Sequence, residues 1–515
     1  MLKKIRISLA IVFFLGTTLL FLDFTGSIHA YLGWMAKIQF LPSLLALNVG
    51  VVIALLVLTA LFGRVYCSVI CPLGVMQDVF SRIGGKFKKN RFKFSPAKSW
   101  LRYSVLTIFV VAFLAGIGSL VALISPYSAY GRIASNLFAP IYQWGNNIIA
   151  GFAERSDSYM FYPVDIWIRG LSTLIVAAVT FVIIGFLSVR HGRTYCNTIC
   201  PVGTILGFIS KFSLYKPMIN TDKCNGCTLC ARRCKASCIN PAEHKIDYSR
   251  CVACFDCIDN CKQGAIEYKR RGTTSNAGSQ NESKTSNNRV QTASKSPNAT
   301  NADTNASSRR NFAANTAVLA LGAVALKAQG KVDGGLTVLP DRIAPKRETK
   351  LVPPGAQSLS HFHQNCTACQ LCVSVCPNHV LRAGDVFGTD TMQPYMSFVD
   401  GYCRPECTKC SEVCPTGAIT EITKADKSAI KIGTAVWNAD LCVVNRDDVD
   451  CDLCERHCPT GAIISVKVKK EGKRTKWIPT VNAERCIGCG ECENLCPSRP
   501  KSAIHVEGIQ SHREI

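Results

Sequence analysis

The chain has 515 residues, of which 48% are hydrophobic, and a mean hydropathy of +0.16, which is high for a soluble protein and predicts a membrane portion. The formal net charge of +24 counts every thiol as neutral, and much of the basic excess lies beside hydrophobic segments, so the charge does not indicate nucleic-acid binding. The 29 cysteines gather in a few clusters and no C-x2-C-H motif occurs, so covalently attached haem is not expected.

Four apolar runs predict a four-helix polytopic membrane domain over residues 1–215, since each run suits a membrane helix of about 20 residues. The runs are Ile7–Leu22, Leu41–Phe62, Tyr103–Ile124 and Gly170–Val189, with a mixed loop between the last two. Between Arg64 and Arg102, nine Lys or Arg residues stand against one acid, which predicts that this loop and both ends of the domain face the cytoplasm. The first run has the alternative of a cleaved signal peptide, although no small-residue cleavage site follows it.

The membrane domain contains an internal repeat, because residues 63–74 match residues 192–203 at a constant offset of 129. Each copy holds Y-C-x3-C-P after an inward-running helix, so both copies should face the same side of the membrane, each with its two thiols on one face. The cysteines are Cys67, Cys71, Cys196 and Cys200. We expect these four thiols to converge near the cytoplasmic interface and to bind a metal, a cluster or a quinone-linked redox centre. The alternative is buried structural cysteine.

Two further cysteine runs predict a cytoplasmic two-cluster ferredoxin domain over residues 216–270. The runs are Cys224, Cys227, Cys230 and Cys234, then Cys251, Cys254, Cys257 and Cys261. In the bacterial pattern the last cysteine of each run ligates the other cluster, so Cys261 would join the first three cysteines and Cys234 the second three. Lys235 and Lys262 replace the usual proline. Cys238 repeats the spacing beyond Cys234 and is either an alternative ligand or, as we expect, a spare thiol.

A polar stretch separates the two halves of the chain. Residues 271–307 are rich in Ser, Thr, Asn and Gln and predict a disordered linker. Arg309 and Arg310 then precede a mildly apolar run, so residues 308–328 resemble a twin-arginine export signal, cleaved or kept as an anchor. The alternative is an ordinary positive-inside pair before a short helix.

The C-terminal stretch, residues 350–508, holds sixteen cysteines in four runs, and each run ends in C-x2-C-x3-C-P, the spacing of 4Fe–4S ligands. A disulfide framework or zinc sites would not repeat this triplet with its Cys-Pro. Spacing alone permits the runs to pair one with two and three with four, or one with four and two with three. The runs are Cys366, Cys369, Cys372, Cys376; Cys403, Cys407, Cys410, Cys414; Cys442, Cys451, Cys454, Cys458; and Cys486, Cys489, Cys492, Cys496.

These motifs resemble a known pair of proteins. Residues 1 to about 270, with two Y-C-x3-C-P copies and a two-cluster ferredoxin, resemble the membrane ferredoxin subunit of the quinol dehydrogenase that serves periplasmic nitrate reductase. Accessory proteins of nitrous-oxide reductase and cytochrome oxidase share that architecture. Residues 308–515, with Arg309-Arg310, Pro353-Pro354-Gly355 and four cluster runs, resemble its exported four-cluster partner. The resemblance implies quinol oxidation and electron delivery to an extracytoplasmic reductase.

The sequence therefore predicts a multidomain protein: a four-helix membrane domain with α+β ferredoxin-like domains, one of two clusters and one of four. We expect six 4Fe–4S clusters, with quinone as a further candidate and no flavin or nucleotide motif. The expected function is electron transfer from quinol to a periplasmic reductase or cytochrome, as a component of a quinol dehydrogenase rather than a self-contained enzyme. The expected location is the bacterial inner membrane, with the first ferredoxin domain cytoplasmic and the C-terminal domain periplasmic. The alternative is a redox maturation factor for a metalloenzyme.

Overall fold

The computed structural model describes residues 1–23, 25–87, 92–157, 160–166, 170–271, 332–333, 337–338, 340–385, 392–469 and 475–515. Residues 1–271 and 344–515 form one compact unit, and residues 272–343 form a second. Beyond Arg271, the predicted linker lies outside the described residues, and so does the segment at 308–328 that resembles an export signal.

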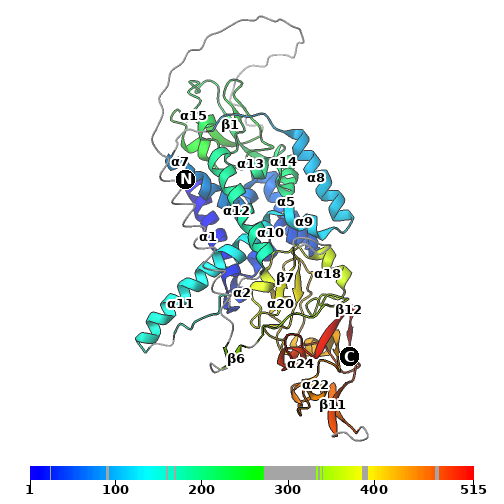
Figure 1. Cartoon of the computed structure of the whole chain (residues 1–515). Helices are drawn as coiled ribbons and strands as arrows, with labels where there is room; N and C mark the ends of the chain where they lie inside the picture. The colour runs from blue at the N-terminus through cyan, green and yellow to red at the C-terminus, as the bar shows by residue number, and fades with distance from the viewer. Residues whose placement is uncertain are drawn as a thin grey trace, which may run out of the picture. The chain divides into compact units, whose positions relative to one another are not determined.

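The N-terminal half is helical, coloured blue to green in Figure 1. Within the described residues, α1 and α12 are long and apolar enough to cross a membrane, with 21 residues each, or about 31 Å of helix. The elements are α1 (Leu2–Leu22), α2 (Ser27–Leu32), α3 (Trp34–Lys37), α4 (Phe40–Leu45), α5 (Val49–Phe62), α6 (Val65–Val69), α7 (Pro72–Phe87), α8 (Ser99–Leu114), α9 (Gly118–Ile124), α10 (Pro126–Ile133), the π-helix η1 (Ala134–Phe138), α11 (Ala139–Arg155), α12 (Leu171–His191), α13 (Thr194–Thr198) and α14 (Pro201–Ser210).

The second and third predicted spans are each divided into two helices. Leu47, with a φ of 52°, separates α4 from α5, and the Asn48 side chain caps α5 by accepting a hydrogen bond from the Val51 N–H. Gly116, with a φ of 71°, separates α8 from α9, because a left-handed residue ends a helix. The predicted mixed loop before α12 contains α10, η1 and α11, so the sequence reading missed three helices there.

The cysteine-rich regions combine short helices with two-stranded antiparallel sheets, the α+β character that the sequence predicts. The pairs are β1–β4, β2–β3, β5–β6, β7–β8, β9–β12 and β10–β11. The elements of the first region are β1 (Tyr215–Ile219), α15 (Leu229–Arg233), β2 (Ile239–Asn240), β3 (Lys245–Ile246), α16 (Asp256–Asp259) and β4 (Ile266–Arg270). After β5 (Val332–Asp333) and β6 (Thr337–Val338) come α18 (Leu359–Asn365), α19 (Leu371–Ser374), β7 (Leu381–Ala383), β8 (Pro394–Met396), α20 (Lys409–Val413), α21 (Lys424–Ala429), β9 (Ile430–Trp437), α22 (Val443–Arg446), α23 (Leu453–Arg456), β10 (Ile463–Val468), β11 (Lys476–Val481), α24 (Glu491–Leu495) and β12 (Ile504–Glu514).

Helix α1 contacts a different cysteine-rich region at each end. Near its start, Lys3 Nζ lies 2.7 Å from a carboxylate oxygen of Asp259 in the first ferredoxin region. Just beyond its end, the Thr25 carbonyl accepts a hydrogen bond of 2.9 Å from Lys409 of the C-terminal region. The length of α1 therefore separates these two contacts.

Helix α12 makes the same connection in the opposite direction. Near its start, the Ser172 hydroxyl donates to Asp385 of the C-terminal region at 3.3 Å. Just after its end, the Arg193 N–H donates to the Lys235 carbonyl of the first ferredoxin region at 2.8 Å. Both long helices thus join the two cysteine-rich regions end to end.

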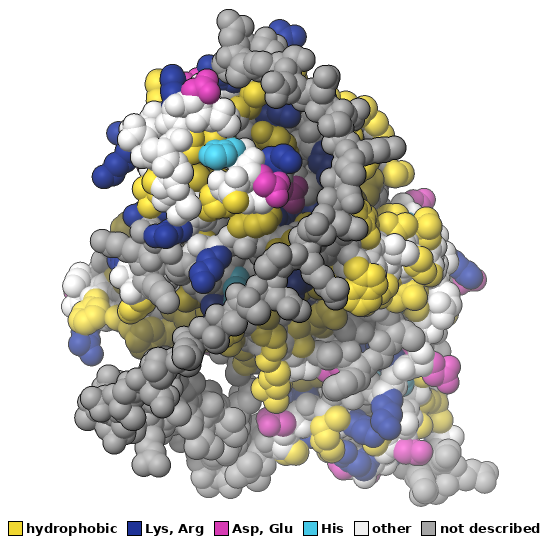
Figure 2. Space-filling model, turned by 90° about the horizontal axis from the view of Figure 1, so that it is seen from above, with side chains coloured by type: hydrophobic (Ala, Val, Ile, Leu, Met, Phe, Trp, Pro, Cys, Tyr) yellow, Lys and Arg dark blue, Asp and Glu magenta, His cyan; other side chains and the backbone are white. Residues whose placement is uncertain are grey.

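The outward faces of the long helices are apolar. On α12, Val182 and Phe186 are 66% and 60% exposed, and α1 exposes Ile11, Val12 and Leu15 in the same way. Figure 2 shows broad hydrophobic areas on the surface, alongside clusters of Lys and Arg. On its inward face α1 buries the small and polar residues Gly16 and Thr17 together with the apolar Leu20 and Phe21. An exposed apolar face of this extent suits contact with lipid.

Candidate iron–sulfur sites

Two cavities in the first ferredoxin region are lined by the thiols of the predicted crossed groupings, and one of them by a fifth thiol as well. One cavity is lined by Cys224, Cys227, Cys230 and Cys261. The other is lined by Cys234, Cys251, Cys254 and Cys257, together with Cys238. The crossing arises because β1 precedes the first run and β4 follows the second. Their pairing brings Cys261 near the start of the first run.

The cysteine loops share one backbone conformation. In four runs, the residues directly before and after the second cysteine both have a positive φ, which wraps the chain around the space that the thiols enclose. Five of these eight positions carry a Cβ, and there the left-handed conformation costs about 1–2 kcal/mol each, whereas the other three are glycine. The pairs are Gly226 and Thr228, Ala253 and Phe255, Ala368 and Gln370, and Gly488 and Gly490.

Cys238 lies directly beside the second group of thiols. Its Sγ is 3.5 Å from that of Cys234. Hydrogen bonds with Cys234 and Cys251, together with burial, raise the pKa of Cys238, whereas the hydrogen bond from Cys238 lowers the pKa of Cys234 to about 7. Five thiols therefore line this cavity, and the choice between alternative ligand and spare thiol stays a prediction.

Lys235, which replaces the usual proline, forms ion pairs that link the ferredoxin region to the helices. Its Nζ lies 3.2 Å from Asp78 on α7 and 2.9 Å from Asp256 on α16. Burial alone would lower the pKa of Lys235, but Asp78 and Asp256 outweigh it and raise that pKa. Lysine at this position therefore has a structural role that proline could not supply.

The C-terminal cysteine runs pair one with two and three with four, which the sequence left open. The cavities that show this are lined by Cys376, Cys403, Cys407 and Cys410, and by Cys442, Cys451, Cys454 and Cys496. For the two remaining groups, burial and the neighbouring thiols raise the pKa of the central thiol, Cys372 or Cys492. Those neighbours are Cys366, Cys369, Cys414 and Cys410 for the first, and Cys489, Cys486, Cys454 and Cys458 for the second, so each central thiol is surrounded by cysteines of its own pair of runs.

Backbone amides donate to several of these sulfurs. The Ala462 N–H lies 3.2 Å from Cys458 Sγ, and the Ala503 N–H lies 3.3 Å from Cys496 Sγ. N–H···S bonds of this kind stabilise the thiolate ligands of an iron–sulfur cluster. Such bonds also raise the reduction potential of a cluster, so these amides are positioned to tune it.

The four cysteines of the internal repeat are all buried and lie near one another. Burial raises the pKa of Cys200, and the charges of Cys196, Cys67 and Cys71 raise it further. The four thiols therefore lie close together, whereas their place at a cytoplasmic interface and the group that they bind stay predictions. The sequence reading missed the arginine that opens each copy, Arg64 or Arg193, although the repeated Gly-Arg was a visible signal.

The alternatives of disulfides and zinc do not fit this geometry. All 29 cysteines are free thiols. In the part of the chain that the structure describes, no three His, Cys, Asp or Glu side chains lie in an arrangement that would hold a single metal ion. The repeated C-x2-C-x3-C spacing and the crossed groupings of thiols instead suit 4Fe–4S clusters.

Comparison with protein families agrees with this assignment. A 4Fe-4S binding domain matches residues 44–90 and 170–217, and a 4Fe-4S dicluster domain matches residues 365–418 and 449–499. The methylamine utilization ferredoxin-type protein MauM of Methylophilus methylotrophus is 37% identical over 195 residues, which cover 34% of this chain and 82% of MauM. This chain belongs to the ferredoxin-type 4Fe–4S proteins related to MauM and NapG.

Two relatives from Escherichia coli extend the comparison. Ferredoxin-type protein NapG is 30% identical over 163 residues, covering 28% of this chain and 66% of NapG. The putative electron transport protein YccM is 24% identical over 226 residues, covering 43% of this chain and 55% of YccM. No solved structure matches the chain. The protein is therefore an iron–sulfur electron-transport protein of the ferredoxin type.

Proposed function

We propose that the chain is a membrane-bound electron carrier that takes electrons from quinol on the side of the first ferredoxin domain and delivers them, through six 4Fe–4S clusters, to a periplasmic reductase or cytochrome. The observation that carries this proposal is the contact pattern of the two long helices. Lys3 and Thr25 at the two ends of α1 contact different ferredoxin regions, and α12 repeats this in reverse. A helix of about 31 Å matches the hydrocarbon thickness of a bilayer.

The distribution of basic residues favours a cytoplasmic first ferredoxin domain. Lys3 and Arg6 lie at the end of α1 that contacts this domain, and the basic segment after α7 contacts it through the Ser95 N–H, which donates to the Ser237 carbonyl at 3.4 Å. Basic segments stay on the cytoplasmic side of a membrane. In this arrangement α4 with α5, and α8 with α9, supply the second and third crossings, and the C-terminal domain faces the periplasm.

A cavity beside the first ferredoxin domain supports quinol as the donor. It has a volume of about 690 Å³, within the range of roughly 300–1,000 Å³ that is usual for small-molecule sites. Ala10 and Val79 belong to its apolar wall, and Arg6, Lys235 and Asp256 to its polar one. Asp256 lies two residues from Cys254 and next to Cys257, so a quinol ring held here would be close to one cluster group. Oxidation would send two electrons singly to the clusters and two protons to water.

Reporter fusions test the topology. Fusions after Lys269 and after Ile515 of the full chain should report cytoplasmic and periplasmic locations, respectively. The same location for both would refute the proposed path across the membrane.

Reduction by a quinol analogue tests the donor. The purified chain in lipid nanodiscs should show cluster reduction by electron paramagnetic resonance, and Val79→Trp should suppress it by filling the cavity. Val182→Trp, on the exposed face of α12, is the matched control and should leave the reduction unchanged. Absence of reduction in the unmodified chain would overturn quinol as the donor and favour a maturation role.

A further inference from the structure

The four thiols of the internal repeat lie in a site built with approximate twofold symmetry. Arg64 donates to the Cys196 carbonyl at 3.1 Å, and Arg193 donates to the Cys67 carbonyl at 2.6 Å, so each copy's arginine holds the other copy's cysteine loop. The glycines at the matching positions make this possible. A Cβ at Gly74 would lie 2.3 Å from the Cys67 carbonyl oxygen, and one at Gly203 would lie 2.2 Å from that of Cys196.

Arg64 is fully buried, yet no carboxylate is among its hydrogen-bond partners in the described residues. Its guanidinium donates to the Asn197 side chain at 2.8 Å and to the Ser249 carbonyl at 3.1 Å, and one nitrogen lies 3.8 Å from Cys67 Sγ. A buried guanidinium without an anion is costly. The neighbouring thiols can supply that anion only as thiolates, which a bound metal centre would stabilise.

The sulfurs also receive hydrogen bonds suited to a cluster. The Gln77 side-chain amide donates to Cys196 Sγ, and the Gly203 N–H donates to Cys200 Sγ, both at 3.3 Å. The thiols show no arrangement for a single metal ion within the described residues. Four thiolates around a 4Fe–4S core of about +2 would carry about −2, which Arg64 would offset fully by one charge and Arg193, shared with Asp78, in part by a second. The matched 4Fe-4S binding domain covers these four cysteines and none of the ferredoxin runs.

We infer that Cys67, Cys71, Cys196 and Cys200 bind a seventh 4Fe–4S cluster, and that this cluster relays electrons between the first ferredoxin domain and the C-terminal domain. The binding site stands on the residues alone, whereas the relay role rests on the proposed function. The relay would take one electron from a reduced cluster of the first ferredoxin domain, which is thereby oxidised, and pass it to an oxidised cluster of the C-terminal domain. No proton or bond is transferred in either step.

The packing on both sides of the site fits a relay. Towards the first ferredoxin domain, Arg64 bridges to the Ser249 carbonyl, two residues before Cys251. Towards the C-terminal domain, the backbone of α10 at Gly131 approaches the Cys369 carbonyl so closely that a Cβ would lie 2.5 Å from it.

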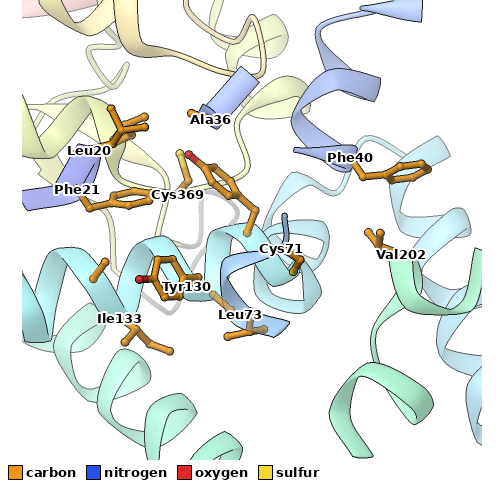
Figure 3. Close-up of a cluster of buried hydrophobic side chains, with 14 of the residues drawn as sticks. Leu20, Phe21, Ala36, Phe40, Cys71, Leu73, Tyr130, Ile133, Val202 and Cys369 are labelled. Carbon is orange, nitrogen blue, oxygen red and sulfur yellow. The ribbon is translucent and has the colours of Figure 1, made fainter. Parts of the chain in front are cut away.

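One hydrophobic cluster contains thiols from all three regions. It includes Cys71 and Cys200 of the repeat, Cys254 of the first ferredoxin region, and Cys369 of the C-terminal region. Figure 3 shows Cys71 and Cys369 in this cluster, with Tyr130 and Ile133. One direct electron transfer would not cross a separation of about 30 Å. A cluster at this site would divide that separation into two shorter steps.

Iron content tests the site without reference to quinol. The double variant Cys71→Ser/Cys200→Ser, purified as the full chain, should lose about four irons and about four acid-labile sulfides per chain relative to the unmodified protein. Ser68→Ala, a buried neighbour on α6, is the matched control and should keep the full content. Unchanged iron in the double variant would overturn the seventh cluster.

Electron transfer tests the relay. With the chain in sealed vesicles and an impermeant reductant on the side of the first ferredoxin domain, the C-terminal clusters should become reduced in the unmodified protein and at least tenfold more slowly in the double variant. Loss of iron with an unchanged rate would overturn the relay while leaving the site. Failure of quinol to reduce the unmodified protein, with reduction by this reductant intact, would instead count against the proposed donor alone.

A milder change covers the case in which the double variant fails to fold. Arg64→Gln removes one positive charge beside the thiols and should make the reduction potential of one cluster signal more negative, with iron content retained. Arg64→Lys keeps the charge and should restore most of the potential. If Arg64 had a purely structural role, neither substitution would change the reduction potential. That outcome would overturn the seventh cluster.

Discussion

Asp78 on α7 lies between three cationic side chains that come from three parts of the chain. It contacts Arg6 of α1, Arg193 before α13 at 2.8 Å, and Lys235 of the first ferredoxin domain at 3.2 Å. The Arg193 side chain is fully buried and that of Asp78 is 10% exposed. Replacing Asp78 by asparagine would leave these cations close together without the charge that balances them.

The expected loss is large because the site is buried. Breaking a buried ion pair by removing one partner costs about 3–5 kcal/mol. The asparagine oxygen can still accept one hydrogen bond from Arg193, so we expect Asp78→Asn to lower the free energy of unfolding by about 3 kcal/mol. Asp259→Asn removes a carboxylate that is 56% exposed and paired with Lys3, and should cost less than about 1 kcal/mol.

Urea unfolding of the detergent-solubilised chain measures the difference. The shift in midpoint, multiplied by the slope of free energy against urea concentration, gives the loss for each variant. Equal losses for Asp78→Asn and Asp259→Asn would refute the reasoning, because the buried cations would then be balanced by water or other groups.

The pH dependence of this contribution has a definite sign. Burial alone would raise the pKa of Asp78, but Arg193, Lys235 and Arg6 outweigh burial and hold that pKa well below its usual range. A carboxyl group with a depressed pKa stabilises the folded state fully above its unfolded pKa of about 3.9, and the stabilisation is lost as the pH falls below that value. The difference in the free energy of unfolding between the unmodified chain and the Asp78→Asn variant should therefore be constant from neutral pH to about pH 5. It should become smaller under more acid conditions.

Three further predictions concern the C-terminal domain. In iron analysis, Cys369→Ser and Cys414→Ser should each remove about four irons per chain, and the two together should remove no more than about four. Cys369→Ser combined with Cys376→Ser should remove about eight. Additive losses for Cys369→Ser and Cys414→Ser would contradict the pairing of the runs. Ala368 has a φ of 50°, so Ala368→Gly should raise the free energy of unfolding by up to about 1 kcal/mol and with it the urea midpoint. A lower midpoint would argue against this backbone conformation. Burial lowers the pKa of His512 to about 4, so stability should fall as the pH drops from about 6.5 towards 4, and His512→Gln should abolish that dependence in urea titrations at several pH values; an unchanged slope would assign it to another group.

The cysteine spacing was sufficient to predict the thiol groups of the ferredoxin domains, because ligand spacing within a run is local. The pairing of the C-terminal runs was not local. Gaps of 27 and 28 residues separate Cys376 from Cys403 and Cys414 from Cys442, and they look alike in sequence. Pairing depends on packing between short helices, such as α19 against α20 and α23 against α24, which periodicity cannot reveal.

The helical half shows a different limit. Hydropathy located the apolar runs, but the breaks at Leu47 and Gly116 depend on single backbone conformations that tertiary contacts select. The helices between α9 and α12 bury polar residues such as Arg132, which donates to the Ala122 carbonyl at 2.9 Å. The mean hydropathy of that stretch indicates a loop, because the polar residues that the helices bury offset the hydropathy of their apolar faces.

The duplication within the helical half explains why the thiol site could not be recognised from either copy. Both copies follow a helix that ends on the same side, so the two loops can approach as a pair related by an axis along the helices. Each copy then supplies two thiols and one arginine, and each arginine binds the carbonyl of the opposite loop, at Cys196 or Cys67. Half of the site has only two thiols and lacks the arginine that orders its own loop. A site of this kind is therefore specified by the repetition itself, and it is complete only when both copies are folded together.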